Sequence, residues 1–174
     1  MDPCGAQRLT SGSKWAIVAR RSLDGGVGRI GRTERPEVFL GDYFHTLDGK
    51  GRVVMPSTFR ETLEDGCVIT KGQDGQLMIF SVEDFRKKAA EVMQQPQDKD
   101  GRRVSRTVFG GADMQKPDKS GRVLIKPELR EYATLEPSTE IAVVGVFDHI
   151  ELWEKDGYLG ERASGDELYL EEEH

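Results

Sequence analysis

The chain has 174 residues, of which 32% are charged and 36% are hydrophobic, and its formal net charge is -6. This composition is typical of a soluble globular protein of one domain, or of two half-domains that share a core. No apolar run approaches the roughly 20 residues of a membrane-spanning helix, so a membrane span is excluded and no membrane partner is expected. Two cysteines, Cys4 and Cys67, make no disulfide framework and indicate a reducing, cytoplasmic compartment, with Cys67 as a buried apolar residue.

The negative charge is concentrated near the C-terminus. Residues 1–37 carry 7 basic and 4 acidic groups, and residues 38–95 carry 7 and 9. Residues 96–135 carry 9 basic and 6 acidic groups, whereas residues 136–174 carry 2 and 12. A nucleic-acid-binding protein needs a local positive patch rather than a positive total, so the net charge argues only weakly against DNA as a partner.

The first 37 residues stand outside the pattern that organises the rest of the chain. They contain a glycine motif, residues 26–31, that matches G-x-G-x-x-G. A dinucleotide site needs a helix directly after such a motif, and Pro36 would end that helix early. We therefore predict a flexible N-terminal extension over residues 1–37 rather than a nucleotide site.

One stretch of sequence occurs twice, seventy residues apart. Residues 48–61 read DGKGRVVMPSTFRE, and residues 118–131 read DKSGRVLIKPELRE. Without a gap they match at Asp, Gly, Arg, Val and the final Arg-Glu, and three further positions stay apolar in both copies. An internal duplication of this kind predicts two equivalent structural units.

In chain order, the first copy predicts a strand, a tight turn, a second strand, a short helix and two more strands. Loose alternation of apolar residues indicates the strands, and the Asp-Gly pair indicates the turn. The ranges in the same order are 38–47, 48–51, 52–55, a helix opened by Pro56 and Ser57, 67–70 and 77–80.

Helices are predicted between the copies, and the second copy repeats the plan of the first. Ser81 and Asp84 form a capping-box pattern for a helix that reaches about Gln95. A polar linker follows, and then a helix ended by glycines. The remaining predictions are a helix over 102–109, a turn over 118–121, a strand over 122–125, a helix over 128–133, strands over 141–146 and 149–153, and fraying from Ser164 onward.

A unit of about 45 residues is too small to bury its own core, so the two copies are expected to pack on each other. The expected organisation has an extension, two repeats, a connecting region and an acidic tail. The segments are 1–37 for the N-terminal extension, 42–84 for repeat 1, 85–112 for the connecting helices and linker, 113–156 for repeat 2, and 157–174 for the acidic C-terminal tail.

The span from Phe39 to Trp153 resembles the MraZ family of bacterial transcriptional regulators, which is built from two SpoVT/AbrB-type DNA-binding repeats. The resemblance rests on a repeated D-x-x-x-R motif, followed each time by apolar residues and an Arg-Glu pair on the helix. It implies a mainly β fold with short helices (α+β). In that fold, a tandem pseudo-two-fold repeat forms a swapped-hairpin double-split β-barrel of the AbrB type.

The resemblance also implies what the protein does and where it starts. It implies a cytoplasmic, nucleoid-associated repressor that binds repeated boxes in double-stranded promoter DNA as a ring-like homo-oligomer. The implied targets are the division and cell-wall gene cluster, including the regulator's own promoter, with no cofactor, metal or small-molecule substrate. Family members begin near the Phe-Leu-Gly stretch, so we hypothesise that the true start is a valine-encoding codon at Val38.

The motif places an arginine at a strand end, directly after a glycine-containing turn, and an aspartate four residues earlier. The planar fork of an arginine suits phosphate or guanine edges, and the aspartate can orient that fork or cap the turn amides. The turn lysines would add positive charge toward phosphate. The expected DNA-binding residues are Asp48, Lys50, Arg52, Asp118, Lys119 and Arg122.

Two alternatives stay open at this point. A single copy could be a plain hairpin turn whose surface ion pair contributes about 0–1 kcal/mol, and Arg60 and Arg130 could either reach DNA or face solvent. The whole fold could also be an AbrB-type barrel used as an antitoxin-like or structural protein-interaction module without DNA. Salt separates the two functions, because DNA binding through Arg and Lys weakens steeply as salt rises.

No other group of residues predicts chemistry. The histidines lack a metal-ligand spacing, and Asp148 and Glu151 could form an acid–base pair only in a region where carboxylates are common. Phe147 and Trp153 could stack a base, but they lie at strand spacing beside apolar residues, so we expect them in the core. The chain is therefore predicted not to be an enzyme.

Overall fold

The computed structural model describes residues 38–94, 96 and 98–172, all of which belong to one compact unit, Arg35–His174. The predicted N-terminal extension, residues 1–37, lies outside the described residues together with its glycine motif. Within the described part of the chain, no helix combines the length and the apolar character that a membrane span requires.

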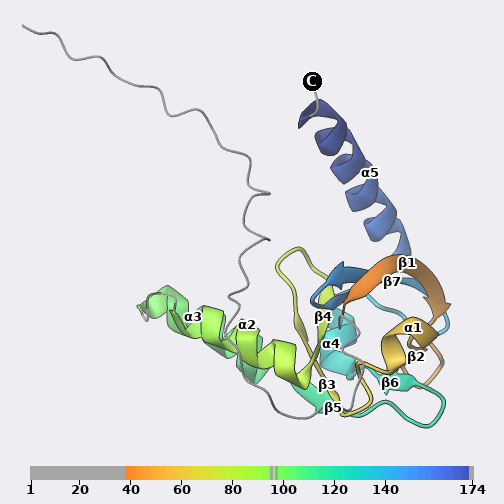
Figure 1. Ribbon diagram of the computed structural model, residues 1–174, viewed down its shortest axis with the longest axis horizontal. Coiled ribbons are helices and arrows are strands. Elements are labelled where there is room, and N and C mark those ends of the chain that lie inside the picture. The colour runs from red at the N-terminus through yellow and green to blue at the C-terminus, as the bar shows by residue number, and fades with distance from the viewer. Residues whose placement is uncertain (1–37, 95, 97, 173–174) are drawn as a thin grey trace, which may run out of the picture. The chain divides into compact units, whose positions relative to one another are not determined.

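The described residues form eight strands and five helices (Figure 1). In chain order these are β1 (Phe39–Thr46), β2 (Arg52–Val54), α1 (Ser57–Arg60), β3 (Cys67–Lys71), β4 (Leu77–Ser81), α2 (Val82–Gln94), α3 (Lys99–Gly110), β5 (Asp113–Gln115), β6 (Arg122–Leu124), α4 (Pro127–Tyr132), β7 (Glu140–Phe147), β8 (Ile150–Glu154) and α5 (Lys155–Glu172).

The strands of the two copies are interleaved. The larger sheet has the order β1-β7-β8-β4-β3-β5, and a separate two-stranded ribbon pairs β2 with β6. Four of the six pairings join strands from different copies, namely β1 with β7, β4 with β8, β3 with β5 and β2 with β6, and all of them are antiparallel. Each copy thus completes the hydrogen bonding of the other.

One hydrophobic core unites both copies, as their small size requires. Two of the aligned apolar pairs of the motif lie in it: Met55 with Ile125, and Phe59 with Leu129, each at most 2% exposed. The third aligned pair, Val54 with Leu124, lies outside the core, because successive residues of a strand point to opposite faces and the neighbouring Val53 and Val123 point inward. Leu124 is accordingly exposed on the outer face of the ribbon.

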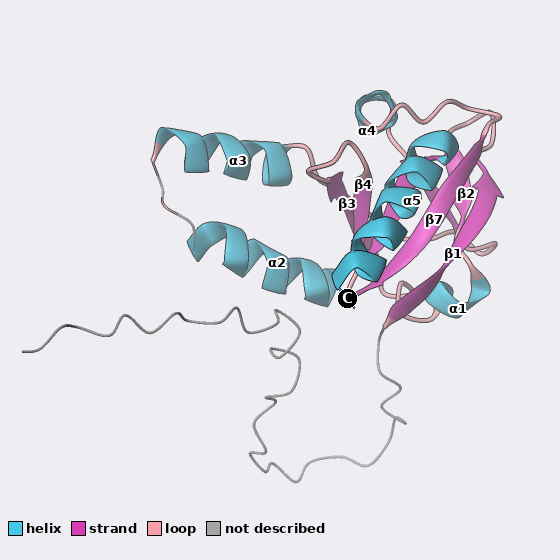
Figure 2. Ribbon diagram, turned by 90° about the horizontal axis from the view of Figure 1, so that it is seen from above, coloured by secondary structure: helices cyan, strands magenta, loops and turns pink. Residues whose placement is uncertain are grey.

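The pairing of the larger sheet leaves it open. Its edge strands are β1 and β5, and among the described residues they do not pair with each other. The mainly β fold with its two interleaved copies agrees with the prediction, but the closed double-split barrel is not confirmed. The helices α2 and α3 form an antiparallel pair beside the strands (Figure 2), with Phe85 and Phe109 in edge-to-face contact.

The expected fraying from Ser164 is wrong for the described residues, because α5 continues to Glu172. The Glu154 carboxylate accepts from the amides of Asp156 and Gly157 at 3.1 and 2.8 Å, and so satisfies free donors at the start of the helix. Asp42 of β1 then accepts from Tyr158 of the helix. The polar, glycine-containing sequence concealed this helix, since its anchor on β1, Asp42, lies 116 residues before Tyr158.

The shared core leads to a prediction about stability. Replacing Ile125, which is fully buried, with alanine should lower the free energy of unfolding by about 2–5 kcal/mol through lost burial and a residual cavity. The control Met114→Ala, at a side chain that is 68% exposed, should change it by less than about 0.5 kcal/mol. Urea unfolding followed by circular dichroism and fluorescence should give coincident single transitions; two separable transitions would contradict a common core.

Candidate nucleic-acid interface

The two motif turns have the same hydrogen-bond geometry. In the first, Asp48 Oδ1 accepts from the main-chain amides of Lys50 at 2.8 Å and Arg52 at 2.9 Å. Its other oxygen, Oδ2, accepts from the Nε of Arg52 at 2.8 Å. One carboxylate therefore closes the turn and holds the arginine side chain at the same time.

The second turn repeats these contacts. Asp118 Oδ1 accepts from the amides of Ser120 at 2.8 Å and Arg122 at 3.0 Å, and Oδ2 accepts from Arg122 Nε at 2.8 Å. In both turns the aspartate thus makes the two kinds of contact suggested by the sequence: it caps turn amides and it holds the arginine side chain. The turn lysines are less alike, because Lys50 is the third residue of its turn and Lys119 the second; both are exposed.

A glycine with positive φ ends each turn. Gly51 has φ +77° and Gly121 has φ +73°, a region that is costly for residues with a Cβ. The Gly51 amide donates to the Asp48 carbonyl and the Gly121 amide to the Asp118 carbonyl, both at 2.8 Å. The glycines therefore allow the tight reversal that brings each arginine back to its aspartate.

The β2–β6 ribbon places both arginines on one face. The register sets Arg52 opposite Leu124, Val53 opposite Val123, and Val54 opposite Arg122. Directly opposed residues share a face, and residues two apart on a strand share it too. Val53 and Val123 consequently face the core, with no exposed area, while Arg52 and Arg122 lie diagonally on the outer face.

The held arginines keep their terminal donors available. The side chains of Arg52 and Arg122 are 29% and 35% exposed, and only Nε is engaged by the aspartate. Among the described residues, neither guanidinium has a hydrogen-bond partner for its Nη atoms. The site thus presents two oriented guanidinium ends, which is the geometry that bidentate recognition of phosphate or guanine needs.

The turns also set the charge of the aspartates. Donation from the main-chain amide of the arginine is the largest cause that lowers the pKa of Asp48 and Asp118. Partial desolvation opposes it, and the guanidinium and a second turn amide lower the pKa further. Both carboxylates are therefore anionic at neutral pH.

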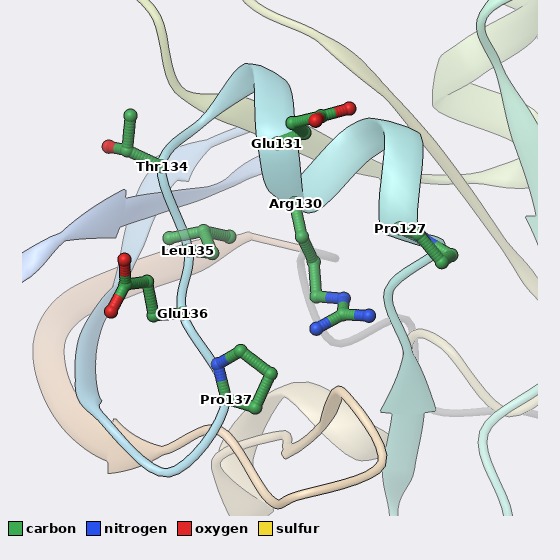
Figure 3. Close-up of a pocket in the computed structure, with 7 residues that line it drawn as sticks. All are labelled: Pro127, Arg130, Glu131, Thr134, Leu135, Glu136 and Pro137. Atoms are coloured by element: carbon green, nitrogen blue, oxygen red, sulfur yellow. The ribbon is translucent and has the colours of Figure 1, made fainter.

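The helix arginines that the sequence left open, Arg60 and Arg130, are partly engaged by the protein. Arg60 Nε donates to the Met55 carbonyl at 2.9 Å, and Arg130 Nε donates to the Ile125 carbonyl at 3.1 Å. Figure 3 shows the Arg130 side chain leaving α4 toward the space between Pro127 and Pro137. This shallow pocket of about 420 Å³ is open to solvent.

The remaining candidates have structural surroundings. His149 stacks on Phe80 with ring centroids 5.1 Å apart, and its Nδ1 lies 2.6 Å from Asp148 Oδ1. Glu151 accepts from Trp153 and, at 3.1 Å, from Gln76, which lies directly before β4. Asp148 thus contacts His149, and Glu151 contacts His149 and Trp153, so neither carboxylate faces an open site.

Two expectations about side-chain burial have different outcomes. Cys67 is buried, as expected, and burial raises the pKa of its thiol to about 12, so it stays protonated. The expectation that Phe147 and Trp153 lie in the core is wrong for Phe147, which is 59% exposed at the end of β7 with φ +64°, and Trp153 is only partly buried. Within the described ranges, no group of three or more His, Cys, Asp or Glu side chains could hold a metal ion.

Two equivalent aspartate–arginine turns, joined by an antiparallel ribbon that places both arginines on one face, define a protein with two tandem D-x-x-x-R repeats. Residues 38–107 and 108–159 each match the family described as "MraZ protein, putative antitoxin-like". These matches cover most of the chain.

A protein of Acetivibrio thermocellus is 42% identical over 131 residues, which are 75% of this chain and 89% of the relative. One of Kineococcus radiotolerans is 42% identical over 118 residues, 67% of this chain and 81% of the relative. One of Paenarthrobacter aurescens is 40% identical over 131 residues, 73% and 90% respectively. Each carries the name Transcriptional regulator MraZ. This chain belongs to the MraZ family.

The turn glycines provide a test of the site geometry. A Cβ at Gly51 would lie 2.8 Å from Arg130 Nε, whereas a Cβ at Gly75, which also has positive φ, would meet nothing within 4 Å. Gly75→Ala should therefore lower the free energy of unfolding only by the backbone strain of a positive φ, about 1–2 kcal/mol. Gly51→Ala should lower the free energy of unfolding, measured in urea, by more than Gly75→Ala does, because the Arg130 side chain must also move. Equal losses would show that the close packing against Gly51 is not needed.

The aspartate pKa gives a second test. A lowered folded-state pKa contributes stability that is complete at pH 7 and is lost as pH falls below about 4. In a carboxyl-carbon NMR titration, Asp48 should titrate below an ordinary aspartate. In Arg52→Gln its pKa should rise but stay lowered, because the larger cause is the main-chain amide. A return to the ordinary value would mean that the guanidinium dominates.

Proposed function

We propose that this chain is a sequence-specific, DNA-binding transcriptional regulator that acts as a repressor, with its two motif turns as the contact to double-stranded promoter DNA. The observation that carries the proposal is the pair of guanidinium ends of Arg52 and Arg122. They lie on one outer face, in the same hydrogen-bonded geometry, with their Nη donors available. The family of named transcriptional regulators supports the same function.

The turn chemistry fits a reader of DNA. Fixing Nε to an aspartate oxygen removes rotational freedom from the arginine before DNA arrives, so less ordering entropy is lost on binding. Phosphate contacts set the position of a protein on the duplex, and base-edge contacts set its sequence preference. Lys50 and Lys119, exposed in the same turns, would add attraction to phosphate.

The proposal extends to assembly and targets. One chain has a single pair of motif turns with modest local basic charge, and its C-terminal helix is acidic, so a single copy would bind weakly. A ring-like homo-oligomer that meets repeated promoter boxes would gain effective concentration instead. From the family resemblance, the boxes belong to the division and cell-wall gene cluster and to the regulator's own promoter. The exchange of β2 and β6 between the copies favours a swapped-hairpin arrangement of the AbrB type.

A second candidate function is an antitoxin-like protein-interaction module without DNA, which the wording of the family description favours. Such a module would use apolar contacts more than the arginine turns. Its binding would therefore depend weakly on salt, whereas phosphate contacts release counterions and weaken steeply with salt.

Fluorescence anisotropy with labelled DNA from the upstream region of the protein's own gene tests the proposal. Wild type should bind this DNA more tightly than scrambled DNA. Arg52→Ala/Arg122→Ala should weaken specific binding at least tenfold, since a good bidentate contact contributes about 1–3 kcal/mol. The salt dependence should also become less steep.

The matched control is Arg162→Ala. Arg162 is a surface arginine on α5, away from the turns, and its Nη1 lies 2.7 Å from Asp42 Oδ2 of β1. This substitution should leave DNA affinity unchanged, and light scattering should show the same assembly for all variants. Equal, weak binding to both DNAs, unaltered by the turn substitutions, would contradict the regulator and favour the interaction module.

A further inference from the structure

The helix arginine of each copy lies against the turn glycine of the other copy. A Cβ built at Gly121 would come within 2.6 Å of Cδ and 3.0 Å of Cζ of Arg60. A Cβ built at Gly51 would come within 2.8 Å of Nε and 3.0 Å of Cζ of Arg130. The arginine stems therefore fill the space that the glycines leave open, and the arrangement is reciprocal.

A continuous series of hydrogen bonds connects each helix arginine to the opposite turn. Arg60 Nε donates to the Met55 carbonyl at 2.9 Å, and the Met55 amide donates to the Gly121 carbonyl at 2.9 Å. The Gly121 amide in turn donates to the carbonyl of Asp118, the residue that holds Arg122.

The equivalent series starts from the second copy. Arg130 Nε donates to the Ile125 carbonyl at 3.1 Å, and the Ile125 amide donates to the Gly51 carbonyl at 2.8 Å. The Gly51 amide then donates to the Asp48 carbonyl at 2.8 Å. Every distance in this series lies within 0.2 Å of its counterpart in the first series, so the two connections are structurally equivalent.

We infer that Arg60 and Arg130 are positioning residues that act across the duplication: Arg60 holds the turn that carries Arg122, and Arg130 holds the turn that carries Arg52. The inference rests on the proposed function only for its DNA readout. Each DNA-contacting arginine would thus be oriented by an aspartate of its own copy and supported by an arginine of the other.

The opposing explanation is that the helix arginines contact phosphate directly. The Nε hydrogen bond and the packing against glycine already constrain both side chains. Lysine separates the explanations, because it keeps a positive charge for phosphate but has neither an Nε donor nor a planar group to lie on the glycine. Arg60→Lys should therefore weaken DNA binding if the role is positioning, and should largely preserve it if the role is direct charge contact.

A double-mutant cycle then assigns the direction of the support. In anisotropy titrations, Arg60→Lys should weaken binding several-fold in the wild type, much less in Arg122→Ala, and by the full factor in Arg52→Ala. Residues that share one interaction are non-additive, whereas independent ones are additive. Arg130→Lys should show the mirror pattern, coupling to Arg52 and not to Arg122. Full additivity with both alanine variants, or coupling within the same copy, would overturn the inference.

Amide hydrogen exchange measured by NMR gives a readout that does not involve DNA. Arg60→Lys should speed exchange at the Gly121 and Arg122 amides and leave Gly51 and Arg52 unchanged. Faster exchange at the same-copy turn, or no change at either, would overturn the inference even if DNA binding holds. The expected exchange pattern without any DNA binding would leave the inference standing and contradict the proposed function.

Folding is controlled in the same samples. Arg162→Lys, on α5, is the matched substitution and should change neither exchange at the turns nor DNA affinity. If Arg60→Lys fails to fold, Arg60→Gln, which keeps a planar end group, replaces it in both measurements with the same expected coupling to Arg122.

Discussion

The antiparallel pairing of β2 with β6 holds the two motif turns in one rigid unit. At its centre Val53 and Val123 are fully buried against each other's strand, and at its ends the amides of Met55 and Ile125 donate to the glycine carbonyls of the opposite turns. Buried main-chain groups must be paired, so neither strand can leave the other without losing these bonds. The geometry of each turn therefore depends on the presence of the other copy, and the interleaved larger sheet extends this dependence to the whole fold.

Within that frame, the aspartates contribute orientation more than stability. An exposed aspartate–arginine pair alone contributes little, about 0–1 kcal/mol. Here the same carboxylate also accepts two turn amides, so one side chain closes the turn and directs the guanidinium. The result is an arginine that is held at Nε but still partly exposed, and whose Nη donors have no partner among the described residues. A surface built for recognition needs this combination, because a fully satisfied arginine could bind nothing further.

The distribution of charge follows the same division of roles. The motif regions are balanced or basic, and the acidic residues gather after residue 136, many of them on α5. The net negative charge of the chain is thus compatible with a local basic face on the ribbon. Asp42 joins α5 to β1 through Tyr158 and Arg162, which places the acidic helix on the larger sheet rather than on the ribbon.

The sequence by itself determined the features that depend on neighbours along the chain. The duplication, the Asp-Gly turns with their terminal glycines, and most strands and helices follow from short-range patterns of apolar residues, caps and turn residues. The pairing of Asp48 with Arg52 belongs here too, since four residues and one turn separate them. Only the tertiary structure decided which strands pair, that the larger sheet stays open, that α5 is anchored on Asp42 of β1, and that Arg60 and Arg130 lie on the opposite turns. These features join residues far apart in the chain, and local periodicity carries no information about which distant partner satisfies a strand edge or a side chain.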